Sequence, residues 1–227
     1  DYSDYPSAET FSFKSGDVFH EEYKEGIYVG YRYFDTFDVP VRYGFGFGLS
    51  YTTFSIKTQK VTVSNLNSEN PVLTAAVEVT NTGVTYSGKE VVQIFVSCPQ
   101  GSRVKEYRRL AGFAKTKELA PGEKQSLSIT FPLYQLTSYE EETASWVLDG
   151  GNYGIWVGNS LSDAKLCAVL SLDQSAVMVS GSNICKKQRE LAEITPDQAK
   201  LLEKQKAWEA IAKEENLPNL QIKSDQI

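Results

Sequence analysis

The feature that most constrains the fold is a series of short runs within residues 53–174 in which apolar and polar side chains alternate. These runs lie at 54–56 with 61–63, 73–80, 90–97, 109–115, 125–131, 144–148, 153–158 and 166–172. Turn-forming clusters such as Asn81-Thr82-Gly83 separate them, and no helical period intervenes. Seven or more short strands in about 120 residues predict a mainly β fold, an antiparallel sandwich of two sheets.

The composition changes on both sides of this region. Residues 1–52 are crowded with Tyr, Phe and Gly, and residues 175–227 become charged and helical in pattern. We place the boundaries near Tyr51 and Ser175. The chain therefore divides into a terminal segment (1–52), the sandwich (53–174) and a linker with a helical tail (175–227).

The tail carries a helix signal. Thr195 is a capping residue, Pro196 stands at the first helical position and Gln198 follows three residues after the cap, which predicts a helix over about 196–216. Its apolar face consists of Leu201, Trp208, Ile211 and Ala212. The helix is expected either to pack on its own sandwich or to bind a partner.

Charge and hydropathy exclude two classes of partner. The 227 residues include 23 Lys and Arg against 29 Asp and Glu, and a net charge of -6 has the wrong sign for binding phosphate backbones. No run approaches the roughly 20 apolar residues of a membrane-spanning helix, and the first residues lack a signal-peptide layout. We expect neither nucleic acid nor membrane as a partner.

The cysteines are odd in number and far apart. Cys98, Cys167 and Cys185 form neither a disulfide framework nor a CxxC metal site, so we interpret them as buried, inert thiols. The sequence has no Asn-x-Ser/Thr sequon. Together these features favour a cytoplasmic over a secreted location, although secreted bacterial proteins also lack sequons.

Several longer motifs are more specific. They are EGIYVGYRYFD (25–35), RYGFGFGLSYTTF (42–54), VTNTG (79–83), GKEVVQIFV (88–96), LAGFAKT (110–116), LAPGE (119–123) and YGIWVGNS (153–160). The first two resemble the end of the α/β sandwich domain of family 3 glycoside hydrolases, the β-glucosidase and β-xylosidase family. The others resemble that family's fibronectin type III-like domain, in the family's order. Gly44, where the family usually has proline, and Ile94-Phe95, where Val-Tyr is common, are small departures.

The resemblance, which covers roughly residues 23–160, implies retaining hydrolysis of β-glycosides by the parent enzyme. In this family a barrel supplies the nucleophile and the α/β domain supplies the acid/base. By this comparison the chain lacks the barrel, keeps only the last helix and strand of the α/β domain, and lacks the acid/base glutamate, which lies upstream of Glu25. In permuted members, the tail after residue 175 would lead into the barrel.

We therefore expect an accessory, structural portion of a β-glucosidase, inactive alone, with no catalytic residue, metal ligand or cofactor of its own. Its partners would be the remaining catalytic domains, on the same or a separate chain, and an oligosaccharide or glycoside substrate. Residues 1–52 should expose aromatic surface, giving dependence on that partner or homo-oligomers. The alternative is a free-standing module whose sandwich binds carbohydrate or protein.

Some charged residues allow a catalytic as well as a structural interpretation. Glu21, Glu22 and Glu25 are either paired acid/base carboxylates or solvated, with Glu25 at a helix start. Arg32 either orients a carboxylate or makes a structural ion pair. His20, the only histidine, is interpreted as a surface residue because one histidine cannot build a histidine-rich metal site.

The glycines and aromatic residues raise two further alternatives. Gly44, Gly46 and Gly48 lack the Lys-Ser/Thr of a phosphate loop, so we predict a tight aromatic connection between domains. Trp146, Trp156 and Tyr86 form either a sugar-stacking platform or part of the sandwich core. The substrate-binding residues stay unknown from the sequence.

Overall fold

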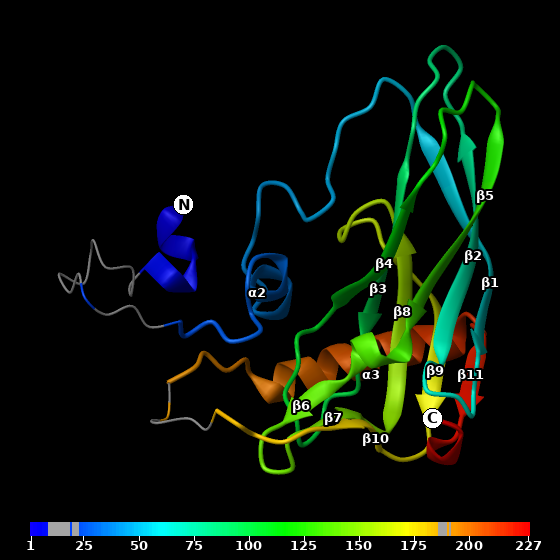
Figure 1. Ribbon diagram of the computed structural model, residues 1–227. Coiled ribbons are helices and arrows are strands. Elements are labelled where there is room, and N and C mark those ends of the chain that lie inside the picture. The colour runs from blue at the N-terminus through cyan, green and yellow to red at the C-terminus, as the bar shows by residue number, and fades with distance from the viewer. Residues whose placement is uncertain (9–18, 20–22, 186–189, 191) are drawn as a thin grey trace.

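The computed structural model describes residues 1–8, 19, 23–185, 190 and 192–227 (Figure 1). The fold is mainly β and is built on the predicted sandwich. One sheet has the strand order β1 (Phe54–Ser64), β2 (Val72–Asn81) and β5 (Lys124–Pro132). The other has the order β11 (Asn219–Ile222), β9 (Lys165–Leu172), β8 (Gly151–Gly158), β3 (Val91–Ser97) and β4 (Arg109–Lys115). A small third sheet consists of β10 (Ala176–Ser180), β7 (Ser145–Leu148) and β6 (Ser138–Glu140).

The core lies between the two larger sheets. Strand β2 shows its physical basis, because alternate residues of a strand point to opposite faces and every second residue of β2 is fully buried. The inward residues of β2 are Leu73, Ala75, Val77 and Val79, each 0% exposed. The inward residues of β3 that meet them in the core include Val92, Ile94 and Val96. Burial of these aliphatic side chains supplies most of the driving force for folding.

Several strands differ from the sequence prediction. β1 is continuous, with a register shift between Thr58 and Lys60 in place of the gap between two predicted runs. Strands β6, β10 and β11, of three to five residues each, were not predicted. β11 pairs with β9 in parallel, so the larger sheet is not wholly antiparallel as expected.

The terminal segment contains helices η1 (Tyr2–Asp4), η2 (Pro6–Ala8) and α2 (Tyr31–Thr36). In the parts of residues 1–52 that are described, the expected last strand of an α/β domain is not present. Gly26 and Gly30 adopt positive φ values of 54° and 61°, which bend the chain shortly before α2. The remaining short helices are η3 (Leu133–Leu136) and η4 (Ser224–Gln226).

The tail helix α3 spans Gln198–Glu214 and packs on the chain's own sandwich (Figure 1). Its N-cap is Asp197, which accepts hydrogen bonds from the backbone of Ala199 and Lys200, so the prediction that Thr195 caps it is wrong. Oδ1 of Asp197 accepts from both free N–H groups, whereas Thr195 lies two residues before the cap position.

Three residues of the predicted apolar face of α3 are buried, namely Leu201, Trp208 and Ala212. Ile211 is 42% exposed, so its place on that face was predicted wrongly. Among the helices of the described residues, none is long and apolar enough to cross a membrane.

Candidate functional site

The Arg108 side chain joins the terminal segment to the sandwich. Its Nε and Nη2 donate to Oδ2 and Oδ1 of Asp35, on α2, at 3.0 and 2.6 Å, and Nη1 donates to the Leu161 carbonyl at 3.1 Å. Its guanidinium carbon lies 5.1 Å from the ring centroid of Tyr107 and 5.4 Å from that of Trp156. A guanidinium binds a carboxylate at two points and stacks on aromatic faces at once, so Arg108 uses both of its recognition modes here.

Two more residues of α2 bind the backbone around the start of β4. The Tyr31 hydroxyl accepts a hydrogen bond from the backbone N–H of Leu110 at 2.8 Å. The Thr36 hydroxyl accepts one from the backbone N–H of Tyr107 at 3.0 Å. Tyr31 and Asp35 are four residues apart, so the helix presents them on one face. We call α2 with residues 106–110 the docking interface.

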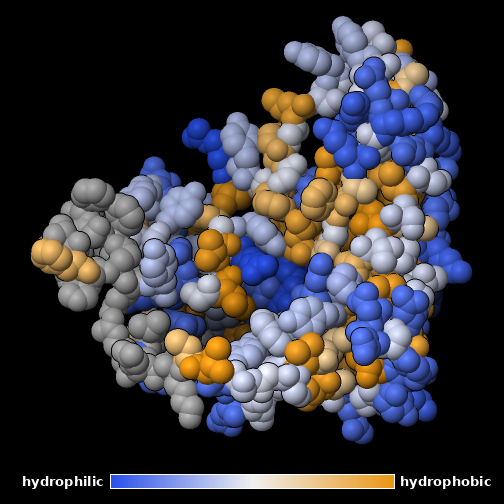
Figure 2. All heavy atoms as spheres, in the orientation of Figure 1, coloured by the Kyte–Doolittle hydropathy of each residue, from blue (hydrophilic) through white to orange (hydrophobic). Residues whose placement is uncertain are grey.

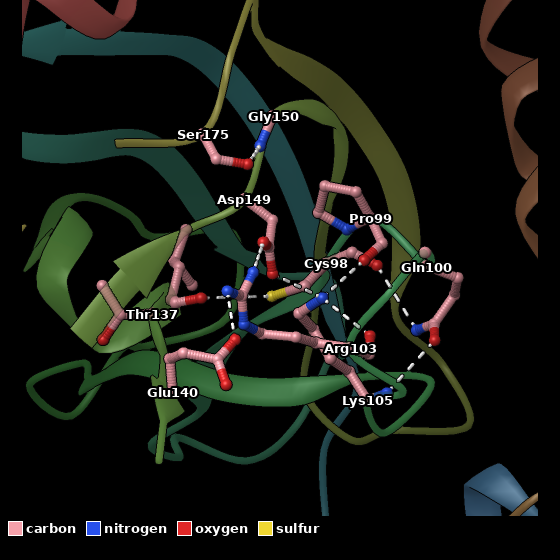
Figure 3. A network of polar contacts seen from close by, with 12 residues as sticks. Cys98, Pro99, Gln100, Arg103, Lys105, Thr137, Glu140, Asp149, Gly150 and Ser175 are labelled. Atoms are coloured by element: carbon pink, nitrogen blue, oxygen red, sulfur yellow. Dashed lines mark hydrogen bonds and ion pairs between the residues drawn. The ribbon is translucent and has the colours of Figure 1, made fainter. Parts of the chain in front are cut away.

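A second group of charges stabilises the loop of residues 99–105, which precedes the docking interface and which we call the braced loop (Figure 3). Lys105 is 2% exposed; its Nζ lies 2.7 Å from Asp149 Oδ2 and donates to the carbonyls of Pro99 and Arg103. Arg103 donates to Asp149 Oδ1 at 2.6 Å and to Glu140. Burial alone lowers the pKa of Arg103, but the hydrogen bond to Glu140 and the charge of Asp149 raise it overall. All four charges are paired, so the cluster braces the loop.

Glu106 links this loop to the terminal segment. Its buried carboxylate has Oε1 2.7 Å from Arg109 Nε and 3.9 Å from Arg32 Nε. Arg32 therefore makes a structural ion pair with the sandwich. Nearby, burial raises the pKa of Tyr28 to about 12, and the charges of Glu106 and Glu193 add to the shift.

A cleft of about 650 Å³ opens where the terminal segment meets the sandwich. Its lining combines the aromatic rings of Tyr31 and Tyr43 with the charges of Asp35, Arg42 and Arg108. Figure 2 shows hydrophobic and hydrophilic side chains side by side on this face of the molecule. Such a mixed surface suits a polypeptide partner or a polar ring compound such as a sugar.

Of the three acidic residues considered from the sequence, Glu25 alone lies within the described residues. Glu25 lies in a turn, where its carbonyl accepts a hydrogen bond from the Tyr28 N–H at 2.8 Å, and α2 begins only at Tyr31. The expectation that Glu25 stands at a helix start is therefore wrong, because Gly26 turns the chain away with a φ of 54°. His20, Glu21 and Glu22 lie outside the described residues.

The glycine-rich run forms the predicted connection between the terminal segment and the sandwich. Gly46 has a φ of 84°, and a Cβ atom there would lie 2.2 Å from Gln93 Nε2, so glycine is required. The carbonyl of the preceding Phe45 accepts a hydrogen bond from the Leu161 N–H at 2.9 Å. Tyr43 and Phe47 stack with ring centroids 4.8 Å apart.

The three aromatic residues considered as a sugar platform lie apart. Trp156 is half-buried beside Trp208 and donates its indole N–H to Ser97 at 3.0 Å. Tyr86 lies beside Tyr51 at the start of the sandwich. Trp146 is 38% exposed and contacts the rings of two other residues, Tyr134 and Tyr139. A common platform is therefore not formed.

The interpretation of the thiols as buried is confirmed for Cys98. Cys167 is partly buried and Cys185 is exposed. Burial raises the pKa of Cys98 and raises that of Cys167 to about 11. Within the described ranges, no group of three or more His, Cys, Asp or Glu side chains is placed to hold a metal ion.

Sequence reasoning did not single out the docking interface. A signal was present, because the run from Arg103 to Arg109 holds four cations and one glutamate directly before a predicted strand. Asp35, its partner, stands out in the sequence only as the last residue of the motif 25–35. No local pattern indicates that Arg108 and Asp35 are in contact, because 73 positions separate them in the sequence.

Comparison with known proteins agrees with this architecture. Residues 90–161 match the fibronectin type III-like domain family. The chain is 39% identical over 184 residues to a β-glucosidase of Ruminococcus albus, covering 78% of this chain and 18% of that protein. It is also 39% identical over 182 residues to β-glucosidase A of Butyrivibrio fibrisolvens, covering 72% and 21%.

Solved structures give the same picture. A β-glucosidase from Paenibacillus barengoltzii matches with a TM-score of 0.74 and 39% identity, over 79% of this chain and 20% of that one. β-Glucosidase 3B from Thermotoga neapolitana, in complex with glucose, matches with a TM-score of 0.68 and 36% identity, over 78% and 24%. The chain spans about a fifth of the length of these relatives.

Proposed function

We propose a function on the premise that this chain belongs to glycoside hydrolase family 3, as a β-glucosidase-related fragment. The complete protein removes terminal β-linked sugars from oligosaccharides or glycosides with retention of configuration. This chain is its accessory, structural portion. The sandwich holds the end of the α/β domain in place and does not carry the reacting groups.

The observation that carries this proposal is the docking interface. On the sandwich, the Arg108 side chain binds the Asp35 carboxylate of α2. The backbone N–H groups of Tyr107 and Leu110 donate to the hydroxyls of Thr36 and Tyr31, respectively. Beyond α2, the chain leaves large apolar residues bare: Leu49 and Tyr51 are each 92% exposed, and Tyr43 is 65% exposed. A segment that is fixed on one side and bare on the other suits the end of a larger domain, whose remaining residues cover the bare side.

The state of the buried carboxylates supports a reaction centre outside these residues. Retaining hydrolysis needs two carboxyl groups about 5 Å apart, one as nucleophile and one as proton donor. Glu106 and Asp149, the buried acidic side chains in the described part of the chain, are both held by cations. A carboxylate paired in this way serves neither role well, because its lone pairs and charge are already engaged.

The test is to purify the natural protein that carries these residues and to measure its denatured mass together with its β-glucosidase activity. We expect activity to accompany either a chain much heavier than 25.3 kDa or a co-purifying catalytic chain. A lone 25.3 kDa species without activity would contradict the proposal.

One observation favours a second candidate, a carbohydrate-binding module. Three neighbouring aromatic side chains, Trp146, Tyr134 and Tyr139, are each 38% to 42% exposed. The Trp146 ring centroid lies 5.7 Å from that of Tyr134 and 5.2 Å from that of Tyr139. Exposed aromatic faces stack on the apolar faces of sugar rings. The rings are tilted by 60° and 56° to that of Trp146, so they offer no flat surface to an extended glucan.

A further inference from the structure

The described C-terminal residues 192–227 touch both the terminal segment and the sandwich. We infer that they form a clasp that holds α2 on the sandwich, and that Lys204 is its positioning residue. This inference concerns contacts within the chain, so it is independent of whether the chain belongs to a larger enzyme.

Lys204 binds the C-terminal end of α2. Its Nζ donates to the carbonyls of Asp35 at 3.1 Å and Thr36 at 3.5 Å, and to Asp38 Oδ1 at 2.6 Å. It also lies 4.7 Å from the centroid of the Tyr107 ring. The last carbonyls of a helix have no intrahelical partner and carry partial negative charge, so an ammonium group there stabilises the helix.

The same lysine therefore contacts both halves of the docking interface. Asp35 and Thr36 belong to α2, whereas Tyr107 belongs to the sandwich side. The Lys204 side chain is 20% exposed, so water weakens these contacts less than it would at an open surface. Lys204 therefore stabilises the docking interface by contacting α2 and the Tyr107 ring at the same time.

The helix that carries Lys204 is firmly anchored. One turn further on, Trp208 is 2% exposed and packs with Leu166 and Val169 of β9 and with Ala212. On the same side, Glu209 accepts a hydrogen bond from Asn152 at 3.0 Å. Burial of a large apolar side chain such as Trp208 fixes α3 on the sandwich, so α3 holds Lys204 in place.

The chain after α3 is built into the sandwich itself. The Pro218 carbonyl accepts a hydrogen bond from the Val169 N–H at 2.8 Å, and β11 then pairs along β9 from Asn219 to Ile222. Ile222 is 5% exposed and joins the main core. β11 also covers the edge of β9, which would otherwise present unpaired backbone groups to other chains.

The start of the clasp is held by the terminal segment and by the braced loop. The Ile194 N–H donates to the Lys24 carbonyl at 2.9 Å. Gln198 donates to the Gly101 carbonyl at 2.7 Å, and Gln205 accepts from the Gln100 N–H at 2.9 Å. The clasp is thus attached at its beginning, middle and end, and it spans the interface that Arg108 holds from the other side.

The test is amide hydrogen exchange, followed by NMR, on the 227-residue chain and its Lys204→Met variant. The reporters are the N–H groups of Tyr107 and Leu110, which bind α2 side chains, and of Phe37 and Val39, which bind α2 carbonyls. We expect these four to exchange about tenfold faster in the variant, since a cation at a partly buried helix C-terminus stabilises the helix against local opening. Amides of the central strand β2 should keep their rates.

Two further variants control this experiment. Lys206→Met removes an exposed cation from the same helix and should change none of the four reporters. Lys204→Arg keeps a cation that can reach the same carbonyls and should restore most of the protection. Unchanged reporters in Lys204→Met, or equal acceleration of β2 and the reporters, would overturn the inference. Neither outcome bears on glycosidase activity.

Discussion

Arg108 on the sandwich and Asp35 on α2 share two hydrogen bonds, although 73 residues separate them in the sequence. Their side chains are 13% and 12% exposed, so the pair is largely removed from water. A buried pair is costly to break, because the charge that stays behind has lost both its partner and its hydration. This pair is therefore a sensitive point at which to test the docking interface.

Arg108→Met should free α2 from the sandwich. We expect the free energy of local opening of α2 to fall by about 3 kcal/mol, because Asp35 is left buried without its cation. Hydrogen exchange at the Phe37 and Val39 amides measures this opening. Arg42→Met is the matched control, since Arg42 lines the same cleft but is exposed. Equal effects of the two substitutions would show that the pair is not what holds α2.

Asn81 should be intolerant of even an isosteric change. Its side chain is fully buried; Nδ2 donates to the carbonyls of Tyr86 and Leu119, and Oδ1 accepts from Thr52 Oγ1 and the Gly83 N–H. Asn81→Asp replaces the two donors by an oxygen that faces two carbonyls. We expect a loss of about 3 kcal/mol in urea unfolding.

Asn70→Asp is the control for this substitution, because Asn70 is exposed in the connection between β1 and β2 and the same exchange there should cost less than about 0.5 kcal/mol. If Asn81→Asp proves as mild as Asn70→Asp, the buried network does not stabilise the start of the sandwich.

The three thiols should differ in their reactivity toward a thiol reagent, and Cys167 should make the stability of the fold depend on pH. At pH 8 a thiol reagent should label Cys185 at once and reach the buried Cys98 only on unfolding, and the partly buried Cys167 should react more slowly than Cys185. Burial raises the pKa of Cys167 to about 11 from an ordinary 9.0. The folded state therefore favours the neutral thiol, and this stability is present below pH 9 and lost as the pH rises through about 11.

Cys167→Ser removes that titration. Between pH 9 and pH 11 the wild-type chain should lose about 2 kcal/mol more stability in urea unfolding than the variant does. Parallel loss in both proteins would assign the alkaline sensitivity to other groups, such as Tyr28.

The 227-residue chain should not hydrolyse aryl β-glucosides. Its buried carboxylates are paired with cations, and the resemblance places both reacting groups elsewhere in the complete enzyme. A chromogenic β-glucoside assay at high protein concentration measures this. Turnover above background that disappears in Glu25→Gln would show that the chain carries its own catalytic carboxylate.

Glucan binding distinguishes the second candidate function. If the chain is only an accessory portion, pull-down on insoluble β-glucan should give no saturable binding. Saturable binding that is lost in Trp146→Ala and kept in Tyr86→Ala would support a binding module instead. Tyr86 is the suitable control, because it is an exposed aromatic residue at a different place on the sandwich.

Local patterns were sufficient for most of the sandwich. Strand β2 alternates so regularly that its sequence indicates both its extent and its buried face, and β4 lies where its apolar run predicted. The tail helix was also predictable, but its cap was placed two residues early, because Thr195 and Asp197 are both good capping residues and only the backbone decides between them. The short strands β6, β10 and β11 carry too little periodicity to be recognised, although the equally short β7 lies within a predicted run.

The sequence by itself determined the strand pattern, the mainly β class and the presence of an amphipathic tail helix, because these depend on the spacing of apolar residues along a few turns or strands. Only the tertiary structure decided that Arg108 meets Asp35, that Lys204 meets the end of α2, and that β11 joins β9 in parallel. These contacts join residues far apart in the chain. Their geometry follows from how the whole core packs, which no local pattern encodes.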